Sequence, residues 1–174
     1  IAADHPLYFG RPNTWGQRYA NLVMQQADLV VALGSRLGLQ QTGFNWEEFA
    51  PVGKVAQVDL DAAELTKGHP RVDLPICADA NAVLGRLLEA DLGDHASWVA
   101  YCRGVKDALP LDDPANHTRR GYVSPFQFGH ELSDLCGPQD IIIPCSSGGA
   151  FTSMMQTFHQ KAGQTIITNK ALAS

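Results

Sequence analysis

The hydrophobic positions in the first half of the chain follow two different spacings. Short unbroken apolar runs at residues 28–34, 54–61 and 74–79 predict three β-strands. Apolar side chains at helical spacing predict helices over residues 15–26 and 79–89. Unbroken apolar strands separated by helices are typical of parallel strands buried on both faces. The pattern therefore predicts an α/β fold, a partial Rossmann-like three-layer sandwich with a parallel sheet.

A polar, turn-rich segment interrupts this pattern. It follows a predicted helix at residues 95–109, and residues 110–121 are rich in proline, aspartate and arginine. We interpret residues 92–121 as an interdomain linker that carries one helix. The linker separates a first domain, at residues 1–91, from the start of a second α/β domain at residues 122–174.

The second domain opens with a helix signal. Ser124 is a good N-cap, Pro125 fits the first helical position and Gln127 the third. These residues predict a helix that ends near Cys136, before Gly-Pro. The later predicted elements are a strand at 140–144, a helix at 152–160 and a strand at 165–168.

Charged residues make up only 18% of the chain, and the net charge is -5. Since a free-standing domain usually carries about 25% charge, we expect part of the surface to be covered by a partner subunit or by further sequence. The chain begins at Ile1 rather than Met, which suggests a piece of something longer. The few basic residues are scattered, so we expect no nucleic-acid partner.

The chain has no apolar run of the roughly 20 residues that a membrane helix needs. Its first residues show no charged and apolar leader pattern. We therefore expect no membrane partner and a cytoplasmic location. The four cysteines (Cys77, Cys102, Cys136 and Cys145) form no CxxC pair, and the histidines show no HxxxH or HExxH spacing. Mostly buried, reduced thiols are a better interpretation than disulfides or a zinc site.

The turn after the first predicted strand contains Gly34, Ser35 and Arg36. Ligands in open α/β sheets bind beyond the carboxyl ends of the strands, where glycine permits close backbone approach. Arg36 could hold a phosphate through two hydrogen bonds. The alternative is an ordinary tight turn in which Arg36 lies in solvent or pairs with an aspartate.

Acidic residues end the next two strands. Asp59 and Asp61 follow the second strand, and Asp79 ends the third. An aspartate in this position can accept hydrogen bonds from a ribose or an adenine. Asp61 can equally cap a helix at residues 62–67, and Asp79 can cap the helix that follows it.

The turn of small residues at 146–150 precedes the predicted helix at 152–160. Backbone N–H groups exposed in such a turn can bind an anion. The turn lacks the lysine of a Walker loop and the GxSxG pattern that would make Ser146 or Ser147 a hydrolase nucleophile. Gly148, Gly149 and Ala150 are therefore candidates for holding a diphosphate, with a simple tight turn as the alternative.

In order along the chain, these segments resemble the acetolactate synthase-like thiamine diphosphate enzymes. The resemblance rests on residues 4–10 (DHPLYFG), 19–21 (YAN), 27–30 (ADLV), 34–36 (GSR), 49–51 (FAP), 54–61, 78–80 (ADA), 124–125 (SP), 141–143, 155–156, 168–169 and 173–174. It spans nearly the whole chain, from the second half of the central domain to the first third of the cofactor domain.

The resemblance implies thiamine diphosphate and Mg²⁺ as cofactors and a 2-oxo acid as substrate. It implies that Gly148, Gly149 and Ala150 hold the diphosphate through their backbone, although synthases of the family carry Gln and His in place of Gly149 and Ala150. It also implies that an FAD or ADP pocket is lined by Gly34, Arg36, Asp59 and Asp79, and that the protein forms a homodimer or homotetramer.

The family's activating glutamate and its GDG metal motif have no counterpart in these 174 residues. We therefore expect the chain to be part of a transferase or lyase, a carboligase or decarboxylase, and not to catalyse by itself. One alternative is a non-catalytic module that binds FAD, ADP or NAD; the cysteine spacing argues against a sirtuin-like form of it. The other alternative is a structural or interaction module.

Overall fold

The computed structural model describes residues 1–111, 113–144 and 148–168. These residues form two compact units. One unit combines Ile1–Arg11 and Trp15–Ala20 with the chain from Arg103 onward, and the other combines Pro12–Thr14 with Asn21–Cys102. The predicted boundaries at residues 91 and 121 stay a prediction.

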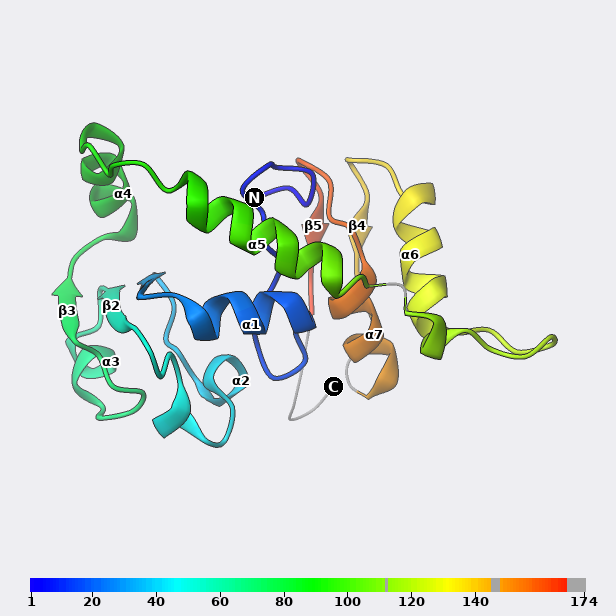
Figure 1. Ribbon diagram of the computed structural model, residues 1–174, viewed down its shortest axis with the longest axis horizontal. Coiled ribbons are helices and arrows are strands. Elements are labelled where there is room, and N and C mark those ends of the chain that lie inside the picture. The colour runs from blue at the N-terminus through cyan, green and yellow to red at the C-terminus, as the bar shows by residue number, and fades with distance from the viewer. Residues whose placement is uncertain (112, 145–147, 169–174) are drawn as a thin grey trace. The chain divides into compact units, whose positions relative to one another are not determined.

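The unit that contains Asn21–Cys102 is built on a three-stranded parallel sheet in the order β1-β2-β3 (Figure 1). The strands are β1 (Leu29–Leu33), β2 (Lys54–Asp59) and β3 (Leu74–Cys77). Leu29 pairs with Lys54, and Ala56 pairs with Leu74. The predicted α/β class with a parallel sheet is thus confirmed.

Helical segments follow each strand of this sheet. They are α2 (Leu39–Thr42), the 3-10 turn η1 (Trp46–Glu48), α3 (Ala62–Thr66) and α4 (Ala80–Glu89). Sequence patterning did not predict α2 or η1, because each is too short to show a helical repeat. The core of the unit consists of Ala32, Leu37, Phe49, Ala50 and Val55.

Burial on both faces holds for the middle strand only. The central residues of β2, Val55–Val58, are all buried, whereas Leu29 and Val31 of β1 are 55% and 44% exposed. The prediction that β1 is buried on both faces is therefore wrong for the described residues. In this sheet β1 and β3 are edge strands, and Ala32 is the one fully buried residue of β1, with Val30 and Leu33 partly buried.

Two helices, α1 (Arg18–Gln26) and α5 (Ala96–Ala108), contribute residues to both units. Both confirm predicted helices, with α1 beginning three residues later than the pattern indicated. Among Cys77, Cys102 and Cys136, all free thiols, only Cys102 is buried. The expectation of mostly buried thiols is therefore wrong for these three, and Cys145 lies outside the described residues.

The other unit contains α6 (Pro125–Leu135), α7 (Gly149–Thr157) and a parallel pair of strands. The strands β4 (Ile141–Ile142) and β5 (Thr165–Ile166) are both shorter than predicted. Ile142, Met154 and Phe158 form the core of this unit. The 3-10 turn η2 (Pro114–Asn116) lies in the segment expected to be a linker.

The N-termini of α6 and α7 differ in how well the sequence predicted them. Ser124 caps α6 by accepting a hydrogen bond from Gln127 N, and Pro125 is the first helical residue, as predicted. Helix α7 instead begins at Gly149, three residues before the predicted start. Glycine disfavours helices in isolation, so the pattern placed the boundary too late.

No helix among the described residues has both the length and the apolar composition needed to cross a bilayer.

Candidate cofactor-binding turns

The turns after β1 and β3 meet at the carboxyl edge of the three-stranded sheet. Gly34 N donates a hydrogen bond to Val58 O at 2.9 Å, which ties the first turn to β2. Gly34 has a φ of +61°, and a Cβ at this position would lie 3.7 Å from Ala80 Cβ at the start of α4. The structure therefore brings Gly34 close to the residue that follows Asp79.

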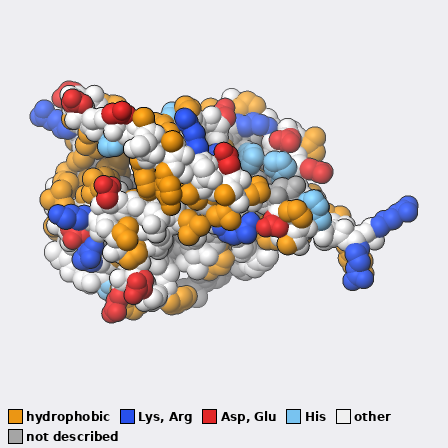
Figure 2. All heavy atoms as spheres, in the orientation of Figure 1, with side chains coloured by type: hydrophobic (Ala, Val, Ile, Leu, Met, Phe, Trp, Pro, Cys, Tyr) orange, Lys and Arg blue, Asp and Glu red, His pale blue; other side chains and the backbone are white. Residues whose placement is uncertain are grey.

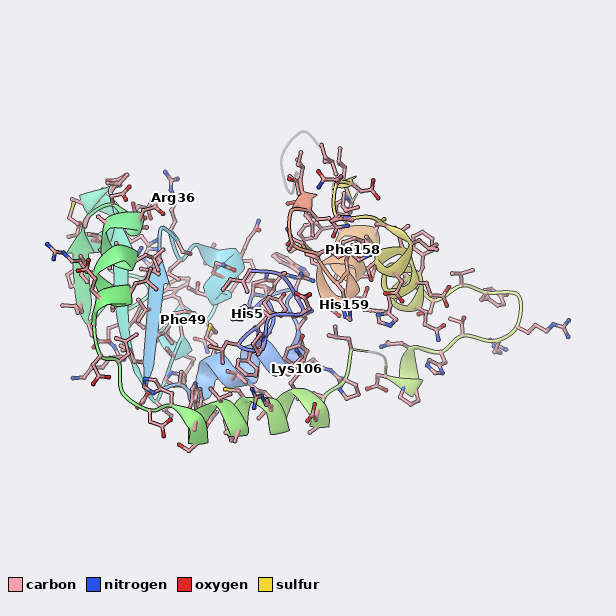
Figure 3. All side chains as sticks on the ribbon, turned by 90° about the horizontal axis from the view of Figure 1, so that it is seen from above. His5, Arg36, Phe49, Lys106, Phe158 and His159 are labelled. Carbon is pink, nitrogen blue, oxygen red and sulfur yellow. The ribbon has the colours of Figure 1, made fainter. Side chains whose placement is uncertain are left out.

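Arg36 pairs with a carboxylate of the neighbouring helix α3. Its Nε lies 3.6 Å from Glu64 Oε1, and its side chain is 77% exposed. Figure 3 shows Arg36 extending outward from its turn. Lys67 binds the same carboxylate at 2.9 Å and also donates to Arg36 O. Because an exposed ion pair contributes at most about 1 kcal/mol, Arg36 can exchange Glu64 for another anion at little cost.

The three aspartates at the strand ends all organise local backbone. Asp59 Oδ1 accepts a hydrogen bond from Asp61 N at 2.9 Å, and Asp61 caps α3 through Ala63 N. Asp79 caps α4 by accepting hydrogen bonds from Asn81 N and Ala82 N. The capping roles considered for Asp61 and Asp79 are thus confirmed. Each of these carboxylates retains a second oxygen with capacity for further acceptance.

Gln57 is a residue of this edge that the sequence analysis missed. It lies in β2, is completely buried, and donates from Nε2 to Ser35 O at 3.0 Å, which positions the turn after β1. Its Oε1 has no hydrogen-bond partner among the described residues. A buried acceptor without a partner usually meets a water or a ligand. The signal was available, since Gln57 is the polar residue in the middle of an apolar strand.

In the other unit, Gly148 is the N-cap of α7. Its φ of 80° and ψ of -155° lie in a region of backbone conformation that is almost restricted to glycine. No side chain caps this helix, and Gly148, Gly149 and Ala150 are all exposed. A helix N-terminus of this form can present the backbone N–H groups of Gly149 and Ala150 to an anion. Ser146 and Ser147, considered as nucleophiles, lie outside the described residues.

The first turn of α7 is held by bonds from the next residues along the helix. Thr152 Oγ1 donates to Gly148 O at 3.1 Å, and Ser153 Oγ donates to Gly149 O at 2.7 Å. These bonds use the carbonyl oxygens of the turn rather than its N–H groups. Within the described part of the chain, no group of three or more His, Cys, Asp or Glu side chains is arranged to hold a metal ion.

Comparison with known proteins connects these turns to a family. Residues 1–87, half of the chain, match the family described as "Thiamine pyrophosphate enzyme, central domain". The chain belongs to the thiamine pyrophosphate enzyme family. The matched residues include β1, β2 and β3 with the turns at Gly34, Asp59 and Asp79. The family resemblance expected from the sequence is therefore confirmed.

Several relatives of this thiamine pyrophosphate enzyme chain are acetolactate synthases. The large subunit from Corynebacterium glutamicum is 35% identical over 145 residues, which cover 80% of this chain and 20% of the relative. A probable large subunit from Methanocaldococcus jannaschii is 36% identical over 115 residues, 63% of this chain and 19% of the relative. The isozyme 2 large subunit from Escherichia coli K12 is 32% identical over 107 residues, 62% of this chain and 19% of the relative. The chain thus spans about a fifth of the length of the curated relatives that it matches.

Proposed function

We propose that this chain is part of a thiamine diphosphate- and Mg²⁺-dependent enzyme that acts on 2-oxo acids, as acetolactate synthases do. The observation that carries the proposal is the family match over residues 1–87, extended by relatives named acetolactate synthase across 80% of the chain. The reaction is proposed to be that of a transferase or of a lyase. Both kinds of enzyme use the same carbanion chemistry, which thiamine diphosphate supplies when it is bound.

The start of α7 fits a diphosphate group. Gly148 adopts a conformation that a side chain would strain, and no atom lies within 4 Å of where a Cβ on Gly148 or Gly149 would stand. The N-terminus of this nine-residue helix carries a partial positive charge. Gly148, Gly149 and Ala150 would therefore hold the diphosphate through backbone N–H groups and orient the cofactor. Mg²⁺ would accompany the diphosphate and neutralise its charge.

The carboxyl edge of the three-stranded sheet suits an adenine nucleotide, FAD or ADP. Arg36 can leave its exposed ion pair to contact a phosphate, and Asp59 and Asp79 keep carboxylate oxygens available to a ribose or an adenine. Gly34 allows close backbone approach. The unpartnered Oε1 of Gln57 supports the proposal, because it offers a buried acceptor beneath the same turn.

The active enzyme is proposed to be a homodimer or homotetramer, and the 174-residue chain is proposed not to turn over a 2-oxo acid by itself. Large hydrophobic side chains are exposed to water, among them Leu135 at 84%, Val123 at 77% and Ile143 at 69%. Figure 2 also shows hydrophobic side chains gathered on the surface of the chain. Such surface is typical of regions that association covers. The exposed free thiol of Cys77 suits the reducing cytoplasm, where we place the protein.

The test is a thermal titration of the 174-residue chain with thiamine diphosphate and Mg²⁺. Binding to the folded state should raise the melting temperature, and Mg²⁺ alone should not. Gly148→Ala should abolish the rise. Gly68→Ala is the matched control, because Gly68 also has a positive φ and open space around it but lies in the other unit. An unchanged response in Gly148→Ala would reject the diphosphate assignment.

The same assay separates the alternatives. A melting-temperature rise with ADP that Arg36→Gln reduces would support the nucleotide pocket. A response to ADP without any response to thiamine diphosphate would instead favour a non-catalytic nucleotide-binding module. A lack of response to either ligand would favour a structural role, and turnover of pyruvate by the chain alone would contradict the proposal that it is inactive.

A further inference from the structure

A cavity lies within the unit that contains α6 and α7. It has a volume of about 690 Å³, within the range of about 300–1,000 Å³ typical of small-molecule pockets. Aromatic side chains form part of its wall, namely Tyr8, Tyr19, Phe126, Phe158 and His159. Gly148, Gly149 and Ala150 are not among them, so the cavity is separate from the proposed diphosphate site.

Lys106 places a positive charge on this aromatic wall. Its ammonium lies 5.9 Å from the ring centres of both Tyr8 and Tyr19 and donates one hydrogen bond, at 3.3 Å, to Tyr8 O. No carboxylate of the described residues lies within 4 Å of Lys106 in an ion pair. A lysine has three N–H donors, so this half-buried ammonium retains donors for a ligand.

The two phenols beside Lys106 do not neutralise it. Burial raises the pKa of Tyr19 to about 12, and burial also raises the pKa of Tyr8. Both tyrosines are therefore uncharged at neutral pH. Their rings stabilise the ammonium without cancelling its charge, which stays available to an anion.

The acidic residues that line the cavity lie where water screens them. They are Asp4, Asp107, Glu131 and Asp134, and all four are exposed. By contrast, Lys106 and His159 are half-buried and Phe158 is buried. Water screens the exposed carboxylates more strongly than it screens Lys106. The ammonium of Lys106 therefore has the larger electrostatic effect on a ligand bound in the cavity.

His159 and His130 contribute two imidazole rings to the wall. Their rings meet edge to face with centres 4.9 Å apart. Burial lowers the pKa of His159, and the neighbouring His130, Arg11 and Lys106 lower it further, against the opposing effect of Asp134. Figure 3 shows His159 directly after Phe158, with Lys106 on α5. A ligand in the cavity would meet the imidazole of His159 and the ammonium of Lys106.

We propose that this cavity binds a small aromatic carboxylate, with its ring against Phe126 and His159 and its carboxylate at the ammonium of Lys106. Lys161 also lines the cavity, but its ammonium already donates to Ser133 O, Asp134 O and Cys136 O. Lys106 is thus the cation with donors to spare, so a monoanion fits better than a diphosphate. An aromatic ring fits the wall better than an aliphatic chain because it can stack on the phenyl and imidazole rings.

The probe for this proposal is 2-naphthoate, and its amide is the uncharged control of the same shape. We expect 2-naphthoate to bind the 174-residue chain with a Kd below about 1 mM, as a ligand of this size should. The amide should bind at least about tenfold more weakly, since it lacks the charged hydrogen bond to Lys106. This comparison needs no variant, so it holds even if substitutions disturb folding.

Variants then locate the site. Lys106→Met should weaken 2-naphthoate binding about tenfold or more while binding of the amide stays the same, and Lys106→Arg should restore most of the affinity. Lys54→Met, at an exposed lysine in the other unit, is the control and should bind like the unaltered chain. Three results would each overturn the proposal. They are equal affinity for 2-naphthoate and its amide, unchanged 2-naphthoate affinity in Lys106→Met, and no 2-naphthoate binding at millimolar concentration.

Discussion

The guanidinium of Arg11 donates two hydrogen bonds to Met155 O, from Nη2 at 2.8 Å and from Nε at 3.1 Å. Nη2 also donates to Phe158 O at 2.9 Å. Both carbonyls belong to the C-terminal end of α7, where the helix leaves its last oxygens without internal partners. Arg11 thereby places a positive charge at the negative end of the helix dipole. The same helix presents its N-terminal end as the candidate diphosphate site.

Arg11→Met should destabilise the unit that contains α7. The substitution removes three charged hydrogen bonds and leaves two half-buried carbonyls without their donor. We expect the free energy of unfolding to fall by about 2–4 kcal/mol, measured by urea denaturation. Arg120→Met, at an exposed arginine, is the control and should change it by less than about 0.5 kcal/mol. Equal stabilities for the two variants would show that Arg11 does not support α7.

A substitution to alanine should have opposite effects at two helical glycines. Gly129 lies in α6 where a Cβ would stand 2.4 Å from Thr157 Oγ1 of α7, so Gly129→Ala must push the helices apart. Gly104 lies in α5 with no atom within 4 Å of its Cβ position. Alanine is favoured over glycine in helices by about 1 kcal/mol, so Gly104→Ala should stabilise the chain.

The expected loss for Gly129→Ala is about 1–3 kcal/mol, the usual cost of overpacking. Urea denaturation of both variants under the same conditions gives the comparison. A stabilising Gly129→Ala would mean that α6 and α7 do not approach each other this closely in solution.

Local signals in the sequence predicted most of the helices and strands. They did not predict features that depend on contacts between residues far apart in the sequence. The caps at Ser124 and Asp79 are read from neighbouring residues, and the structure confirms both. The hydrogen bonds between Arg11 and Met155 join residues 144 positions apart, and no local pattern reveals them. The position of the Lys106 ammonium beside the rings of Tyr8 and Tyr19 is likewise a product of tertiary packing.

The candidate cofactor turns were predicted as small or acidic residues at strand ends, and the sequence could not show what each one contacts. Arg36 was expected either in solvent or paired with an aspartate, and the structure pairs it with Glu64. Gln57 was missed because a single polar residue inside a strand was treated as part of the apolar run. Its role becomes visible only once β2 lies beside the turn after β1.

The stability of the unit that contains His159 should fall as the pH drops below about 6.5. Burial lowers the pKa of His159 below the value near 6.5 that it has in the unfolded chain. Below that pH the unfolded chain takes up a proton that the folded chain does not, so unfolding becomes easier until the folded-state pKa is passed. His159→Gln should flatten this dependence between pH 7.5 and 5.5.

Urea midpoints measured across this pH range test the expectation. His117→Gln is the control, since His117 is exposed, and it should retain the dependence of the unaltered chain. If the slope survives in His159→Gln and disappears in the control, the dependence does not arise from His159.

At alkaline pH the relevant group is Tyr19, whose phenol donates a hydrogen bond to Gln17 Oε1 at 3.0 Å. Burial raises its pKa from 10.0 to about 12. The stability that the protonated phenol provides is therefore complete below pH 10 and is lost as the pH rises from 10 to about 12, because the unfolded chain ionises first.

Tyrosinate absorbance should show one of the four tyrosines ionising near pH 12. Tyr19→Phe should remove that step, whereas Tyr122→Phe, at an exposed tyrosine, should leave it in place; the opposite result would assign the step to another residue.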